Sequence, residues 1–147
     1  MGRDFGGMEI VTLKTFSEYT NDILVLGVDS ALSYLGYGTS DYMRHPIFVI
    51  DTLECGQLVR GMPWIVGVRS IGELLDTSYR NIKVTTLVDS ILDTIDFNKY
   101  SEHLMHALAE IEGDVSICRE LTHKAERRGL GEVLEWEWKE MRGYYNY

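Results

Sequence analysis

One row of apolar and small side chains restricts the fold of this chain more than any other feature. Its members recur at alternating intervals of four and three residues, which places them on one face of an α-helix. The row consists of Leu104, Leu108, Ile111, Val115, Cys118, Thr122 and Ala125. Basic residues followed by Gly129 are typical of a helix end. The pattern predicts one long helix near 101–128.

The length of this helix leaves its shape open. At 1.5 Å per residue it would be about 42 Å long, whereas a compact domain of 147 residues is about 38 Å across. The helix therefore spans the domain, protrudes from it, or breaks at Gly113-Asp114. If the row is exposed, two copies of the chain can also pair through it as a homo-oligomer.

The rest of the chain mixes strand and helix patterns. Short apolar runs between turn residues predict strands over 8–13, 47–50 and 62–68. Capping-box spacings and helical periodicity predict helices over 15–35, 70–76, 84–97 and 130–142. A strand is a competing interpretation for 23–26 and for 130–142.

These elements predict an α+β fold in a single domain over 1–147. We expect a small N-terminal β-sheet with packed helices and a helix-rich C-terminal half that includes the long helix near 101–128. In this division residues 1–7 are disordered, 8–69 contain the sheet, and 70–147 are helical.

The charge of the chain is acidic and unevenly distributed. It has 23 acidic and 14 basic residues, a net charge of −9. Residues 1–69 hold eight acidic and five basic residues, a net of −3, and residues 70–147 hold fifteen and nine, a net of −6. This balance argues against direct nucleic-acid binding and favours a basic protein partner, such as a nucleic-acid-processing complex.

Other features of the composition indicate a cytoplasmic protein. Cys55 and Cys118 are the two cysteines, which is typical of free thiols in a reducing compartment. No apolar run approaches the ~18 residues of a membrane span, and the first ten residues lack the apolar core of a secretion signal. We expect no cofactor and no membrane contact.

Three aspartates form a stripe on the helix expected over 84–97. Asp89, Asp93 and Asp96 are spaced i, i+4 and i+7, opposite the face of Ile91 and Ile95. Like charges one turn apart repel each other, so the stripe is consistent with a Mg²⁺ site or with contact to a basic partner. The simpler interpretation is a solvated face that keeps the chain soluble.

A second cluster has the residue types of a metal site. Its members, all on the expected long helix, are Glu102, His103, His106 and Glu110. Two histidines at i and i+3 with a flanking carboxylate can ligate zinc or a similar divalent metal, with further ligands from elsewhere in the fold. The simpler interpretation is a solvated helix face with Glu–His pairs.

The C-terminal segment combines tryptophan with glutamate. Its residues of interest are Glu135, Trp136, Glu137, Trp138 and Glu140. A helix buries one stripe, so the two tryptophans cannot both face the same core, and one of them is expected to be exposed. Exposed tryptophans are typical of interface hot spots, so the segment is a candidate partner-binding surface.

Three functions remain in competition. The first is a non-enzymatic acidic interaction protein, by class analogy a phage or mobile-element inhibitor that presents carboxylates where a basic nucleic-acid-handling protein binds phosphates. The second is a structural or assembly subunit that oligomerises through the 104–125 row. The third is a small metal-dependent enzyme or ligand-binding protein.

Overall fold

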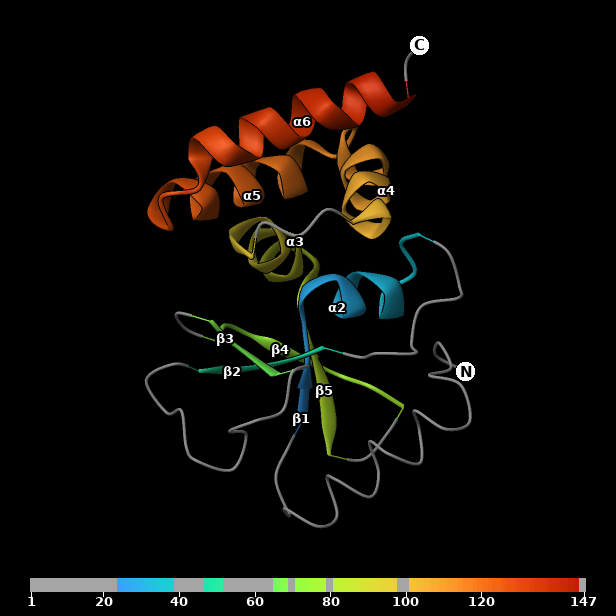
Figure 1. Ribbon diagram of the computed structural model, residues 1–147, viewed down its shortest axis with the longest axis vertical. Coiled ribbons are helices and arrows are strands. Elements are labelled where there is room, and N and C mark those ends of the chain that lie inside the picture. Colours follow the sequence, from blue (N-terminus) through green and yellow to red (C-terminus); the bar gives the residue numbers. More distant parts are fainter. Residues whose placement is uncertain are drawn as a thin grey trace.

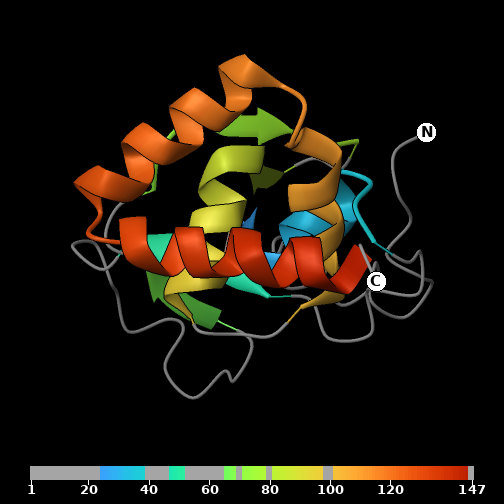
Figure 2. The ribbon, with the colours of Figure 1, turned by 90° about the horizontal axis from the view of Figure 1, so that it is seen from above.

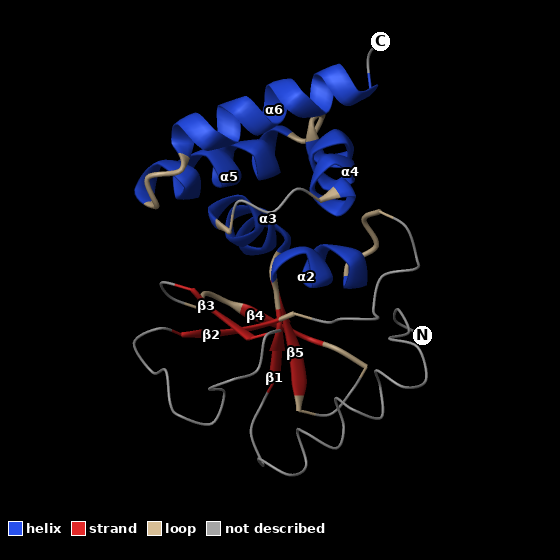
Figure 3. Cartoon of the chain, viewed as in Figure 1, coloured by secondary structure: helices blue, strands red, loops and turns tan. Residues whose placement is uncertain are grey.

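The computed structural model describes residues 24–38, 47–51, 65–68, 71–78, 81–97 and 101–145, and the side chains of 51 and 65–67 are left out of this description. Its strands are β1 (Leu24–Leu26), β2 (Phe48–Asp51), β3 (Ile65–Val68), β4 (Leu74–Asp76) and β5 (Ile82–Thr85). Its helices are α2 (Val28–Tyr34), α3 (Leu87–Asp96), α4 (Glu102–Ile111), α5 (Val115–Arg127) and α6 (Gly131–Tyr145). The α+β class with a helix-rich C-terminal half is confirmed, as Figure 3 shows. The strand expected over 8–13 lies outside the described residues.

The strands form a mixed sheet with β1 at its centre. The order is β3-β2-β1-β5-β4, in which β1 runs parallel to β5 and antiparallel to β2. Since β1 has neighbours on both sides and is buried on both faces, its sequence is a continuous apolar run rather than an alternating one. The predicted strand over 47–50 is confirmed as β2, and that over 62–68 is confirmed for its second half as β3.

The described helices stack on one side of the sheet (Figure 1). Helices α2 and α3 lie next to the sheet, and α6 is the helix farthest from it (Figures 1 and 2). One apolar core joins side chains from all five helices; among its members are Leu32, Ile91, Leu92, Leu104, Leu108, Leu121, Leu134 and Met141. No helix within the described ranges is both long and apolar enough to cross a membrane.

The helix expected over 15–35 is wrong at residues 24–26, where the chain forms β1. The competing strand interpretation is confirmed for Leu24–Leu26. Gly27 lies between β1 and α2. A Cβ atom at Gly27 would lie 2.3 Å from Cγ1 of Val49, so only glycine lets the end of β1 approach β2 this closely. Residues 15–23 lie outside the described residues.

Two further helix predictions are corrected by strand pairing. Residues 74–76 form β4, not the end of a helix over 70–76, because they pair antiparallel with β5. The helix expected over 84–97 begins later, at Leu87, where the Thr86 side chain accepts a hydrogen bond from the backbone N–H of Asp89. Among the described residues of the 70–147 half, the helices therefore begin at Leu87.

The single long helix near 101–128 is in fact two helices, α4 and α5. The chain breaks at Gly113-Asp114, one of the three outcomes that the sequence left open. The Asp114 side chain accepts a hydrogen bond from the Ile117 N–H at 3.1 Å, which starts a new helix. The break divides the 104–125 row: Leu104 is buried in the core, whereas Val115 is 69% exposed. The helix expected over 130–142 is confirmed as α6.

Candidate partner-binding surface

The two tryptophans of α6 lie on opposite sides of the helix. Leu134 and Met141 are buried, and Trp138, one turn after Leu134, packs against the same core. Trp136 lies two residues from Leu134, which turns it about 200° around the helix axis. Its side chain is 57% exposed. The prediction that only one tryptophan faces the core is confirmed.

The side of α6 that carries Trp136 is exposed over several turns. We call this surface the outer face of α6; its residues are Glu132, Val133, Glu135, Trp136, Lys139 and Glu140, all of them exposed. Glu132 and Glu140 lie one turn before and one turn after Trp136. Within the described part of the chain, neither glutamate forms an ion pair. The indole therefore lies between two carboxylates that this part of the chain does not neutralise.

Glu137 lies at the edge between the outer face and the core. Burial raises the pKa of its carboxyl group, and the nearby carboxylate of Glu140 raises it further. Both causes disfavour the charged form of Glu137. The carboxylates of Glu137 and Glu140 therefore repel each other. A cation beside this edge would offset the repulsion between the Glu137 and Glu140 carboxylates.

The inner side of α6 contains an ion pair and a cation–π contact. The Arg142 guanidinium lies 5.8 Å from the ring centroid of Trp138. Its Nε donates to Oε1 of Glu112, 3.3 Å away, at the end of α4. The hydroxyl of Tyr144 donates to Oε1 of Glu102 at 3.4 Å. These contacts hold α6 against both ends of α4.

The aspartate stripe on α3 faces basic residues of the same chain. Arg128 Nη2 donates to Oδ1 of Asp93 at 2.8 Å and lies 3.6 Å from Oδ2 of Asp96, and Lys124 Nζ lies 3.6 Å from Oδ1 of Asp89. The expectation of a solvated face is wrong for Asp93, which is 3% exposed. Burial raises the pKa of Asp93 to about 6, against the opposing effect of Arg128. Binding of a partner or of Mg²⁺ by this stripe stays a prediction.

The histidines of α4 contact the α2 region. Nδ1 of His106 accepts a hydrogen bond from the backbone N–H of Gly38 at 2.8 Å, and Nδ1 of His103 lies 4.0 Å from Oδ2 of Asp29. Gly38 approaches α4 so closely that a Cβ atom there would lie 2.2 Å from Cδ2 of His103. The histidines thus position the turn that follows α2.

The four predicted metal ligands differ in burial, and metal binding by them stays a prediction. Glu102 and Glu110 are exposed, whereas His103 and His106 are half-buried against the α2 region. Among the described residues, no group of three or more histidine, cysteine, aspartate or glutamate side chains is arranged to hold a metal ion.

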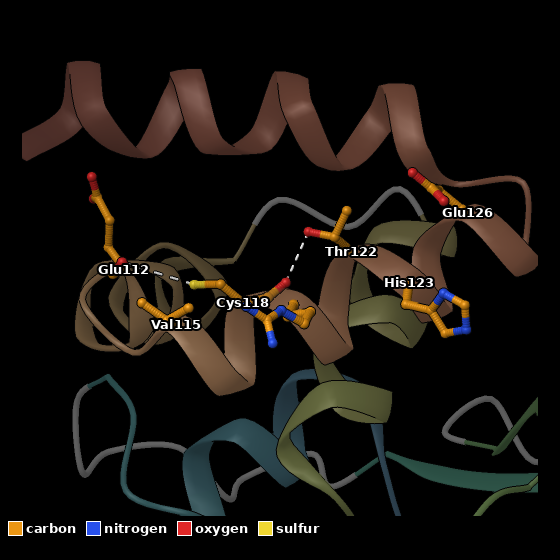
Figure 4. Close-up of a pocket in the computed structure, with 7 residues that line it drawn as sticks. Glu112, Val115, Cys118, Thr122, His123 and Glu126 are labelled. Atoms are coloured by element: carbon orange, nitrogen blue, oxygen red, sulfur yellow. Dashed lines mark hydrogen bonds between the residues drawn. The ribbon is translucent and has the colours of Figure 1, made fainter.

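A groove lies along α5 (Figure 4), with a volume of about 520 Å³. Its lining combines carboxylates, Arg119 and His123 with the exposed Val115. The Cys118 thiol donates to the Ile111 carbonyl oxygen at 3.1 Å, and its pKa is raised by burial and by Asp114 and Glu112. Since a raised pKa keeps the thiol protonated, Cys118 is a poor nucleophile. The sequence missed this groove because the break at residues 113–114 turns Val115 away from the core.

Comparison with known proteins found no matching family model, no matching curated protein and no matching solved structure.

Proposed function

We propose that this protein is a non-enzymatic interaction protein that binds a basic protein partner through the outer face of α6. The observation that carries the proposal is the exposure of Trp136, 57%, between Glu132 and Glu140. An exposed tryptophan is a common anchor of protein interfaces, and the surrounding carboxylates favour a positively charged partner.

The class of partner follows from the charge of the whole chain. With a net charge of −9, the protein attracts basic surfaces over distances of about 10 Å at moderate salt. Surfaces that bind nucleic acid are basic because they must neutralise phosphates. We propose that the partner is a nucleic-acid-handling protein. By analogy of charge alone, we propose that this protein is a phage or mobile-element inhibitor of that partner.

The structure supports the two competing functions less well. Assembly through the 104–125 row requires an exposed apolar surface, but Leu104, Leu108 and Ile111 are buried inside the chain. A metal-dependent enzyme that uses the α4 cluster requires converging ligands, but His103 and His106 contact the α2 region instead.

Affinity capture from extracts of the encoding organism tests the proposal. The wild-type protein is compared with Trp136→Ala and with Val115→Ala, which alters another exposed apolar side chain on a different helix. We expect a basic nucleic-acid-binding protein on the wild-type and Val115→Ala columns, absent from the Trp136→Ala column. It should elute at about 0.5 M salt, where charge contacts are screened. Retention of the same proteins by all three columns, or of none by the wild type, would contradict the proposal.

A further inference from the structure

Among the described residues, a guanidinium lies over the ring of Trp138 on α6, and none lies over the ring of Trp136. At Trp138, Arg142 lies over the ring and also donates to the Glu112 carboxylate. At Trp136, carboxylates are present on the neighbouring turns, but no arginine of the described residues lies over the ring. Each site therefore has a tryptophan ring and nearby carboxylates, but among the described residues only the Trp138 site has a cation.

The residues around Trp136 form a row along α6 that turns by about 40° around the helix axis at each step. Glu132, Trp136 and Glu140 follow at intervals of four residues, so their Cα atoms lie about 6 Å apart along one side of α6. A planar cation stacked on the indole would have a carboxylate on each side. Figure 2 shows α6 as the outermost helix. The three side chains of the row, on the side of α6 opposite to Leu134, are all exposed.

The chemistry of this row favours arginine over lysine. A guanidinium is planar, stacks on aromatic rings, and carries N–H groups that fit carboxylates on more than one side. An ammonium is compact and more strongly hydrated. The nearest basic residue, Lys139, lies one turn from Trp136, and within the described part of the chain it forms neither an ion pair nor a cation–π contact.

We infer that the Glu132–Trp136–Glu140 row is a recognition site for an arginine side chain of the partner protein. The guanidinium stacks on the Trp136 indole and donates hydrogen bonds to the Glu132 and Glu140 carboxylates. This inference rests on the proposed function, because it assumes that the outer face of α6 binds a basic partner. It adds the residue type that the partner must present.

A solution NMR titration tests the site without knowledge of the partner. The probes are the blocked amino acids Nα-acetyl-arginine amide, Nα-acetyl-lysine amide and Nα-acetyl-citrulline amide, the last a neutral analogue of arginine. The indole N–H signal of Trp136, assigned by its loss in Trp136→Phe, should move saturably with the arginine probe. The shift should be smaller with lysine and absent with citrulline, and the other two indole signals should stay in place.

Paired variants test the carboxylates. Glu132→Gln/Glu140→Gln removes two charges from the row, and Glu120→Gln/Glu126→Gln removes two exposed charges from α5, outside the outer face of α6. We expect the first variant to weaken arginine binding about tenfold or more and the second to change it by less than about twofold. Equal shifts with arginine and citrulline, or equal binding by the two variants, would overturn the inference.

The outcomes separate this inference from the proposed function. A captured partner whose binding depends on Trp136, together with no arginine response, overturns the arginine site and leaves the partner-binding surface in place. An arginine response without any captured partner supports the site and counts against the proposed function.

Discussion

The carboxylate of Asp93 on α3 and the guanidinium of Arg128 at the end of α5 form an ion pair, with Nη2 and Oδ1 2.8 Å apart. The two residues are 35 positions apart in the sequence, and their contact holds the α5–α6 turn against α3. Asp93 is almost fully buried, so its charge depends on this partner.

We expect Arg128→Met to lower the free energy of unfolding by about 3 kcal/mol, because it leaves a buried carboxylate unpaired. Urea denaturation measures the change. Lys124→Met is the matched control: its ion pair with Asp89 is longer, 3.6 Å, and its side chain is 35% exposed, so we expect a loss of at most about 1 kcal/mol. If the two variants lose equal free energy of unfolding, the burial of the Asp93 carboxylate does not determine the effect of Arg128→Met.

The pKa of Asp93 predicts a pH dependence of stability. Folding raises this pKa from 3.8 to about 6, so the folded state binds the proton more tightly. The contribution to stability is complete below about pH 4 and is lost as the pH rises through about 6. Its full size is about 3 kcal/mol. Since other carboxylates also titrate here, the measurement is the difference in unfolding free energy between wild type and Asp93→Asn at about pH 4 and about pH 7. A difference that does not change with pH would contradict this assignment.

Gly27 should not tolerate a side chain. We expect Gly27→Ala to cost about 2 kcal/mol, because the new methyl group would lie 2.3 Å from Cγ1 of Val49. The double variant Gly27→Ala/Val49→Ala should lose less than the sum of the two single changes. Gly143→Ala on α6 is the control: a Cβ there meets nothing within 4 Å, so stability should rise by up to about 1 kcal/mol. Strict additivity at positions 27 and 49 would argue against the close approach of β1 and β2.

The α4 histidines should act in packing. We expect His106→Ala to lower the free energy of unfolding by about 1 kcal/mol, since it removes the acceptor of the Gly38 N–H. Addition of Zn²⁺ or of EDTA should leave the melting temperature of the wild type unchanged in a thermal-shift assay. A rise with Zn²⁺ that disappears in His103→Ala would instead establish the metal site.

Local patterns predicted the helices well where tertiary pairing did not compete. The periodicity over 130–142 gave α6, and the argument that one helix buries one stripe gave the exposure of one tryptophan. The same reasoning failed at 74–76 and at 24–26. Apart from Asp76, those residues have apolar side chains that suit either element, and pairing with β5 and β2 decides their conformation.

The contacts of the aspartate stripe and of the α4 histidines could not be predicted from the spacing of residues in the sequence. Residue spacing predicts the aspartate stripe, but it explains Lys124 and Arg128 as basic residues at a helix end, where the helix dipole already accounts for them. The bend at Gly113-Asp114 folds α5 back so that these side chains reach α3. Likewise, the α4 histidines contact a turn more than sixty residues away, and no local pattern encodes that distance.

The separation of α6 into a buried side and the outer face has a consequence for how recognition can change. Leu134, Trp138 and Met141 secure the helix to the core, and none of them is on the outer face. We therefore expect substitutions at Glu132, Trp136 or Glu140 to leave the fold intact. A protein that binds its partner through the outer face, as proposed above, could change its specificity one residue at a time along this helix while the rest of the molecule stays the same.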